Sequence, residues 1–139
     1  MVFENKNPCM LIFDSGHYHN LAVTITQKNS ISNPDGSPQF YRLPGYPIYL
    51  ALCYKFFGTT PHNALWIQII LASLVPILIF ALALILFPES IILAQCAALA
   101  ASINPGFLIF SGLIMTEILF LIFFILFLCL FFRNFNFFF

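Results

Sequence analysis

The chain has 139 residues, of which 61% are hydrophobic and only 7% are charged. Soluble domains carry about 25% charged residues, so this chain lacks the polar side chains needed to coat a water-soluble fold. Its five basic and five acidic side chains cancel to a net charge of zero, which leaves no basic surface for nucleic-acid binding. The composition predicts an all-α, polytopic membrane protein whose partners are membrane lipids and not nucleic acid.

Residues 1–63 are the polar part of the chain and are expected to lie outside the bilayer core. They hold seven of the ten charged residues, namely Glu4, Lys6, Asp14, Lys28, Asp35, Arg42 and Lys55. After Asp14-Ser15, apolar residues recur at helical spacing, and residues 44–57 resume an amphipathic pattern rich in tyrosine after the turn-rich loop at 29–39. Two amphipathic helices lying in the headgroup layer are therefore predicted, the second ending at Gly58.

Residues 64–132 are predicted to contain about three transmembrane helices. The segment 65–87 has 23 residues without a charge, about 34 Å as a helix, which matches a hydrocarbon core of about 30 Å. Pro76 is expected to kink it. The second span is placed at about 91–110, as a helix to 103 followed by a loop or re-entrant bend at 104–111, and the third at about 112–132. Residues 133–139 are interpreted as an aromatic tail.

Three charged residues are candidates for function, each with a simpler structural alternative. Glu117 opens the last apolar run, where it either faces a cavity or simply marks the interfacial start of a helix. Asp14 begins a membrane-adjacent helix with His17 and Tyr18 one turn later, and it is either a functional carboxylate or a plain helix cap. Arg42 precedes a rigid Pro-Gly turn, where it either holds a phosphate or extends to lipid headgroups.

Metal and soluble-enzyme motifs are absent or weak in the sequence. Asp14, His17 and His19 could share a metal only if the chain bent, because positions 17 and 19 do not point alike on a regular element. The four cysteines are widely spaced, which indicates neither a disulfide framework nor a zinc site. No Gly-x-Ser-x-Gly, phosphate-binding glycine loop or His-Glu-x-x-His is present. No cofactor is expected, with a divalent metal left open as an alternative.

Short segments with distinctive residues follow one another along the chain. They are Asp14–Tyr18, Leu21-Ala22, Arg42–Ala51, Phe57-Gly58, Gln68, Asn104-Pro105, Ser111-Gly112 and Thr116-Glu117. In this order and spacing they resemble the N-terminal part of the multispanning GT-C glycosyltransferases, in particular the protein O-mannosyltransferase and aminoarabinose-transferase type. The resemblance extends from about Asp14 to Cys129.

The resemblance implies a transferase that moves a sugar, with inversion, from a polyprenyl-phosphate donor to an extracytoplasmic acceptor in a bacterial inner (plasma) membrane. It implies that residues 1–63 are an extracytoplasmic loop, that Asp14 acts as or beside the catalytic base, and that Glu117 is the second acidic residue. His17, Tyr18 and Arg42 would bind substrate, and the cationic Arg42 is suited to hold the leaving phosphate.

The chain also departs from the family pattern. Family members usually begin with a span before the catalytic-loop aspartate and continue for several hundred residues, so this chain is expected to be a fragment that is inactive alone. Four basic residues precede the first span and one follows the last, which favours the opposite orientation to the family's. The alternatives to an enzyme are a small membrane subunit and a transporter fragment with proline-broken helices near 76 and 105.

Overall fold

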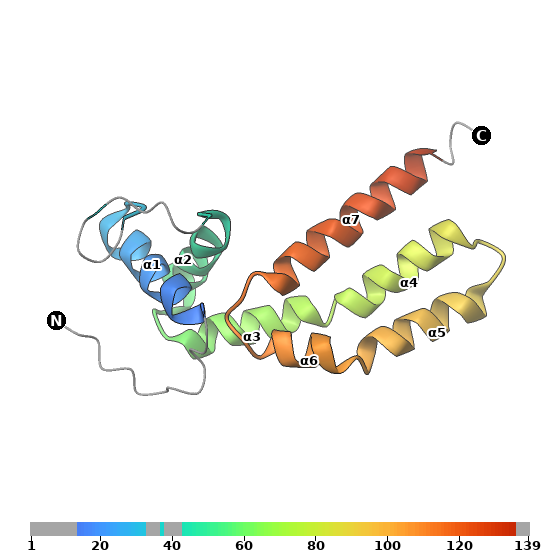
Figure 1. Ribbon diagram of the computed structural model, residues 1–139, viewed down its shortest axis with the longest axis horizontal. Coiled ribbons are helices and arrows are strands. Elements are labelled where there is room, and N and C mark those ends of the chain that lie inside the picture. Colours follow the sequence, from blue (N-terminus) through green and yellow to red (C-terminus); the bar gives the residue numbers. More distant parts are fainter. Residues whose placement is uncertain (1–13, 33–36, 38–42, 136–139) are drawn as a thin grey trace. The chain divides into compact units, whose positions relative to one another are not determined.

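The computed structural model describes residues 14–32, 37 and 43–135, and all regular structure in this part of the chain is helical (Figure 1). This confirms the predicted all-α class. The helices are α1 (Ser15–Lys28), α2 (Gly45–Phe57), α3 (Pro61–Ala72), α4 (Val75–Leu86), α5 (Ile91–Ser102), α6 (Pro105–Ser111) and α7 (Glu117–Phe135).

The chain divides into two compact units. The first contains the residues up to Gln68 together with Gly112–Thr116, and the second contains Ile69–Ser111 and the chain from Glu117 onward. The boundary therefore lies within α3, five residues beyond the predicted division at residue 63, and a short segment distant in sequence joins the polar N-terminal part.

In the first unit, α1 packs along α2. Small side chains allow the close approach, since Ala22 is 0% exposed and Ala51 is 6% exposed. The hydroxyl of Thr26 donates to the Ala22 carbonyl within α1 at 2.8 Å, and it also lies 3.4 Å from the Ala51 carbonyl of α2. Of the predicted apolar face of α1, Tyr18, Leu21 and Ala22 are buried and Ile25 is half-buried.

The ends of α1 and α2 use residues that tolerate a left-handed or otherwise unusual backbone. Asn29 follows α1 with φ 50°, and its N–H donates to the Ile25 carbonyl at 2.9 Å. Gly58 ends α2 with φ 88°, where a Cβ would be strained, so glycine is required for the chain to turn here. The predicted end of the second amphipathic helix at Gly58 is confirmed.

In the second unit, α4 packs against both α5 and α7. The α4–α7 contact is centred on Val75, Ile118, Ile122 and Ile125, all less than 10% exposed. The three isoleucines recur at helical spacing and form one stripe of α7. Against α5, the buried side chains are the small residues Ala94 and Ala101, which let two helix backbones approach closely.

Two of the predicted apolar segments are interrupted. The helix is interrupted at Ser73-Leu74, two residues before Pro76, near the kink that was expected there, and α3 and α4 follow one another within one apolar stretch, Pro61–Leu86. At 104–111, where a loop or re-entrant bend was expected, the structure contains helix α6, bent by 51° from α5, which agrees with the bend and not with a loop. The carbonyl oxygen of the Asn104 side chain accepts from Gly106 N at 2.9 Å, so Asn104 caps α6 and Pro105 occupies its first position.

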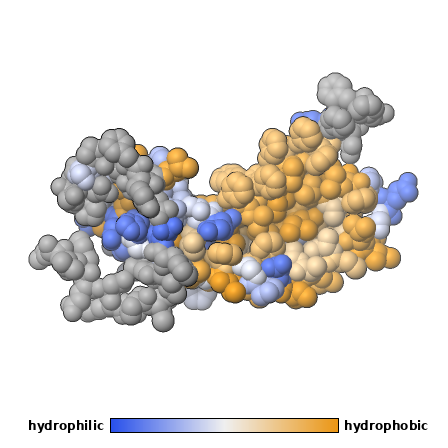
Figure 2. Space-filling view, in the orientation of Figure 1, coloured by the Kyte–Doolittle hydropathy of each residue, from blue (hydrophilic) through white to orange (hydrophobic). Residues whose placement is uncertain are grey.

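In the part of the chain that the structure describes, two helices are long and apolar enough to cross a membrane, and a third is added if the bent pair α5–α6 counts as one span. The first runs over Pro61–Leu86 and the other over Glu117–Asn134. The last of these begins at Glu117, five residues later than predicted, because Gly112–Thr116 is not helical. Figure 2 shows an almost continuous apolar surface over α4, α5 and α7, as expected for helices that face lipid.

We predict that Ile118→Ala lowers the free energy of unfolding by about 1–3 kcal/mol, because it opens a cavity between α4 and α7. Phe123→Ala on the same helix, at a side chain that is 68% exposed, is the control and should cost much less. Thermal unfolding followed by circular dichroism in detergent micelles measures both. Equal losses for the two variants would contradict the assigned packing.

Candidate functional site

Asp14 stands at the N-terminus of α1 and is half-buried. Its backbone carbonyl accepts from His17 N at 3.0 Å and Tyr18 N at 3.2 Å, whereas its side chain makes no capping hydrogen bond to the helix. Asp14 is thus the N-cap residue of α1 through its backbone carbonyl, in agreement with the helix-cap alternative, but not through its side chain. A carboxylate at this position is nevertheless favoured by the positive end of the helix dipole.

His17 and Tyr18 have different surroundings although they are adjacent. The imidazole of His17 is exposed, one turn from Asp14, and is available to a molecule approaching from solvent. The ring of Tyr18 is buried at 8% exposure and packs edge-on against Tyr46, with ring centroids 5.1 Å apart. Tyr18 thus anchors the Asp14 end of α1 to α2.

Tyr46 continues this anchor towards α3. Its hydroxyl donates to Oε1 of Gln68 at 2.6 Å, and Gln68 is 1% exposed. The Nε2 atom of Gln68 in turn donates to the Leu113 carbonyl, in the non-helical segment before α7. A single amide therefore bonds to α2 and to residues 112–116, and both of its polar ends are paired in apolar surroundings.

Tyr49 lies one turn after Tyr46 but is not paired in the same way. Within the described residues its buried hydroxyl makes no hydrogen bond of ordinary geometry. Burial raises the pKa of Tyr49, and the Cys53 thiol one turn later adds to this rise. The phenol is therefore neutral at physiological pH, and its hydroxyl is a polar group that the local packing leaves poorly satisfied.

His19 and Tyr54 form a second aromatic pair between α1 and α2. Their rings meet edge-on with centroids 5.5 Å apart, and Nδ1 of His19 lies 2.7 Å from the Tyr54 hydroxyl. Burial lowers the pKa of His19 from its ordinary value of 6.5 and raises the pKa of Tyr54. At neutral pH the imidazole is therefore neutral, and its Nδ1 shares a hydrogen bond with the phenol hydroxyl.

The His19–Tyr54 pair was missed by sequence reasoning, which considered His19 only as a metal ligand. No group of three His, Cys, Asp or Glu residues that could hold a metal occurs in the part of the chain that the structure describes. His19 is instead used to join two helices. The available signal was a histidine on the same face as Ala22, at a spacing that directs it towards the neighbouring helix.

The second predicted carboxylate, Glu117, is half-buried in the first turn of α7, where the helix dipole favours its charge. It belongs to the second unit and Asp14 to the first. The expectation that the two acids face one cavity stays a prediction. Arg42 lies outside the described residues, and so does the predicted phosphate contact.

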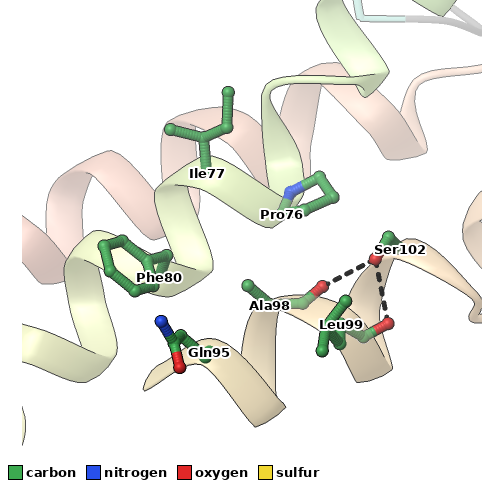
Figure 3. Close-up of a pocket in the computed structure, with 7 residues that line it drawn as sticks. All are labelled: Pro76, Ile77, Phe80, Gln95, Ala98, Leu99 and Ser102. Atoms are coloured by element: carbon green, nitrogen blue, oxygen red, sulfur yellow. Dashed lines mark hydrogen bonds between the residues drawn. The ribbon is translucent and has the colours of Figure 1, made fainter. Parts of the chain in front are cut away.

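A groove of about 490 Å³ lies between α4 and α5 (Figure 3). Its walls are mainly apolar, and Phe80 of α4 and Gln95 of α5 face one another across it. Ser102 donates to the carbonyls of Ala98 and Leu99, both at 2.9 Å, so its hydroxyl is satisfied within α5. A groove with mainly apolar walls is suited to bind an apolar chain. Its complete lining is Pro76, Ile77, Phe80, Gln95, Ala98, Leu99 and Ser102.

No known family model, curated protein or solved structure matches this chain. The fold and site define an all-helical protein with two or three helices able to cross a membrane and a polar unit joined to the first of them.

We predict that Tyr46→Phe lowers the free energy of unfolding by about 1–3 kcal/mol, because it removes a donor to the buried Gln68 amide while keeping the ring against Tyr18. Tyr49→Phe is the matched control, since it removes a hydroxyl that lacks a good hydrogen bond, and it should be neutral or slightly stabilising. Thermal unfolding in detergent compares the two. The assigned network is wrong if Tyr49→Phe costs as much as Tyr46→Phe.

We also predict that stability falls as the pH drops below about 6.5, the ordinary pKa of histidine. Below this pH the unfolded chain binds a proton at His19 before the folded chain does, so the stabilisation is complete above 6.5 and is lost towards the lower folded pKa. His19→Gln should reduce the difference in melting temperature between pH 7.5 and pH 5.

The control for this experiment is His17→Gln at an exposed position of the same helix, which should keep the wild-type difference. A pH dependence that is unchanged in His19→Gln and reduced in His17→Gln would contradict the assignment.

Proposed function

We propose that this chain is part of an integral membrane glycosyltransferase of the GT-C type, which transfers a sugar from a polyprenyl-phosphate donor to an extracytoplasmic acceptor. The observation that carries the proposal is the chain of contacts from Tyr18 through Tyr46 to Gln68. These three residues belong to separate segments of the resemblance, and they meet in the unit that bears Asp14. The resemblance was first based on the order of these segments in the sequence. Contacts between their residues in one packed unit are a second observation that supports it.

The chemistry of the reaction fits this arrangement. A lipid-linked donor carries its sugar at the membrane surface, so the reactive carboxylate is needed on a helix joined to a span and outside the hydrocarbon. Asp14, at the start of α1, would take this position and would remove the acceptor proton while the sugar carbon develops positive charge. Exposed His17 would contact the sugar or its phosphate, and Arg42 would stabilise the leaving phosphate.

The remaining parts of the proposal concern Glu117, the donor lipid and the location. Glu117 would supply the second carboxylate, and a divalent cation between carboxylate and phosphate is an alternative to a metal-free site. The apolar groove between α4 and α5 is suited to hold part of the polyprenyl chain. We place the protein in a bacterial inner membrane, as a multi-pass protein with residues 1–63 on the extracytoplasmic side.

The 51° break between α5 and α6 favours one other function. Discontinuous helices at membrane depth are typical of transporters, where the broken ends bind the transported solute or ion. A transporter fragment is therefore the second candidate, and a small non-enzymatic membrane subunit is the third. Neither predicts that replacement of Asp14 abolishes sugar transfer.

We predict that Asp14→Asn lowers sugar transfer at least about 100-fold, because general-base catalysis contributes about 10²–10⁴ to such a rate, and that Glu117→Gln also impairs it. The assay follows radiolabelled sugar from polyprenyl phosphate to acceptor, in membranes from cells that express the protein. It is run with and without a chelator to test for a metal.

Glu89→Gln is the control, because Glu89 is an exposed acid in the turn between α4 and α5 and should transfer at the wild-type rate. Full activity of Asp14→Asn at normal expression would remove Asp14 from the mechanism. Absence of transfer from every polyprenyl-phosphate sugar tested, in wild-type membranes that contain the protein, would contradict the transferase proposal.

A further inference from the structure

Helix α2 is apolar on both of its faces, but among the described residues only one of them is covered by protein. The covered face includes Leu50 and Tyr54, which are 0% and 2% exposed. The opposite face carries Ile48, Leu52 and Phe56, which are 40%, 53% and 75% exposed. These three residues recur every four positions and form one stripe, here called the outer stripe of α2. A helix that is apolar all round is normally buried on all sides.

Helix α1 differs from α2 in the character of its outer face. Its exposed side chains are His17, Asn20, Gln27 and Lys28, all polar or charged. The two helices pack on each other, so the pair has a polar outer surface on α1 and an apolar outer surface on α2. The sequence pattern predicted that both helices lie in the headgroup layer. Their exposed side chains differ, because those of α1 are polar and those of the outer stripe of α2 are apolar.

Lipid is the occupant that best fits the outer stripe. Only Gly58, Thr59 and Thr60 separate α2 from α3, which begins the first candidate span. Three residues reach at most about 11 Å when fully extended, so the end of α2 stays close to the membrane surface. Lys55 is the one charged side chain in α2, beside Phe56, and its length allows the ammonium to reach the headgroups while the stripe enters the acyl region.

We propose that the outer stripe of α2 is inserted at the boundary between headgroups and acyl chains, and that α1 rests on the aqueous side of α2. The inference depends on the membrane location in the proposed function, and it is independent of sugar transfer. It places Asp14 and His17 on the helix that faces water, where a polar acceptor or the headgroup end of a lipid-linked donor has access.

The test uses single-tryptophan variants of the full chain. Trp66 is the one tryptophan of the sequence, and Trp66→Phe provides a background without it. Leu52→Trp then reports on the outer stripe, and Asn20→Trp on the outer face of α1. Each protein is reconstituted in vesicles of phosphatidylcholine and phosphatidylglycerol, either unbrominated or brominated in the acyl chains, and fluorescence is also titrated with iodide in water.

We expect brominated lipid to reduce Leu52→Trp emission at least twofold and to leave Asn20→Trp nearly unchanged, with iodide giving the reverse order. Phe56→Trp repeats the measurement should Leu52→Trp fail to fold. Strong iodide quenching of the stripe would show that water covers it, and quenching by neither agent would show that protein covers it. Equal quenching of both helices by brominated lipid would overturn the assigned orientation. Each of these three results contradicts the proposal.

The wild-type protein separates this inference from the membrane location itself. Trp66 is 64% exposed on α3 and should be quenched by brominated lipid if the first candidate span is inserted. Quenching of Trp66 without quenching at position 52 would remove only the lipid contact of α2. Absence of quenching at both positions would remove the membrane location as well.

Discussion

A buried side-chain amide must have its hydrogen bonds within the protein, because neither lipid nor a packed core offers a replacement. Gln68 imposes this constraint on the first unit. Its oxygen accepts from Tyr46 of α2, and its nitrogen donates to the Leu113 carbonyl. These two bonds link α2 to α3 and α3 to residues 112–116, and α1 is in turn held by the contact of Tyr18 with Tyr46.

The second unit is held by a different kind of interaction. Its helices are apolar on nearly every side, and their surface resembles their interior, so hydrophobicity alone gives them no preferred partner in lipid. The fit between side chains determines which helices pack together. Alanines allow α5 to approach α4, and a stripe of isoleucines on α7 contacts Val75. The polar unit is thus specified by hydrogen bonds and aromatic contacts, and the apolar unit by the fit of its side chains.

The sequence predicted most of the helices but few of the side-chain contacts between them. Apolar periodicity, Gly58 and the charge distribution predicted α1, α2 and the apolar runs, because these signals are local. Residues 104–111 were predicted as a loop or re-entrant bend, since Asn104-Pro105 is compatible both with a break and with a helix start, and they form a helix bent from α5. The bond between Tyr46 and Gln68 and the pairing of His19 with Tyr54 join residues 22 and 35 positions apart. Such partners depend on tertiary packing, which one sequence does not specify.

The bond from Gln68 to Leu113 also has a consequence for biogenesis. The two residues are 45 positions apart, so the ribosome must complete the whole α4–α5 hairpin and α6 before the amide finds its second partner. Until then the Gln68 nitrogen lacks the partner that it has in the folded chain. The first unit can therefore be completed only after the intervening hairpin has been synthesised.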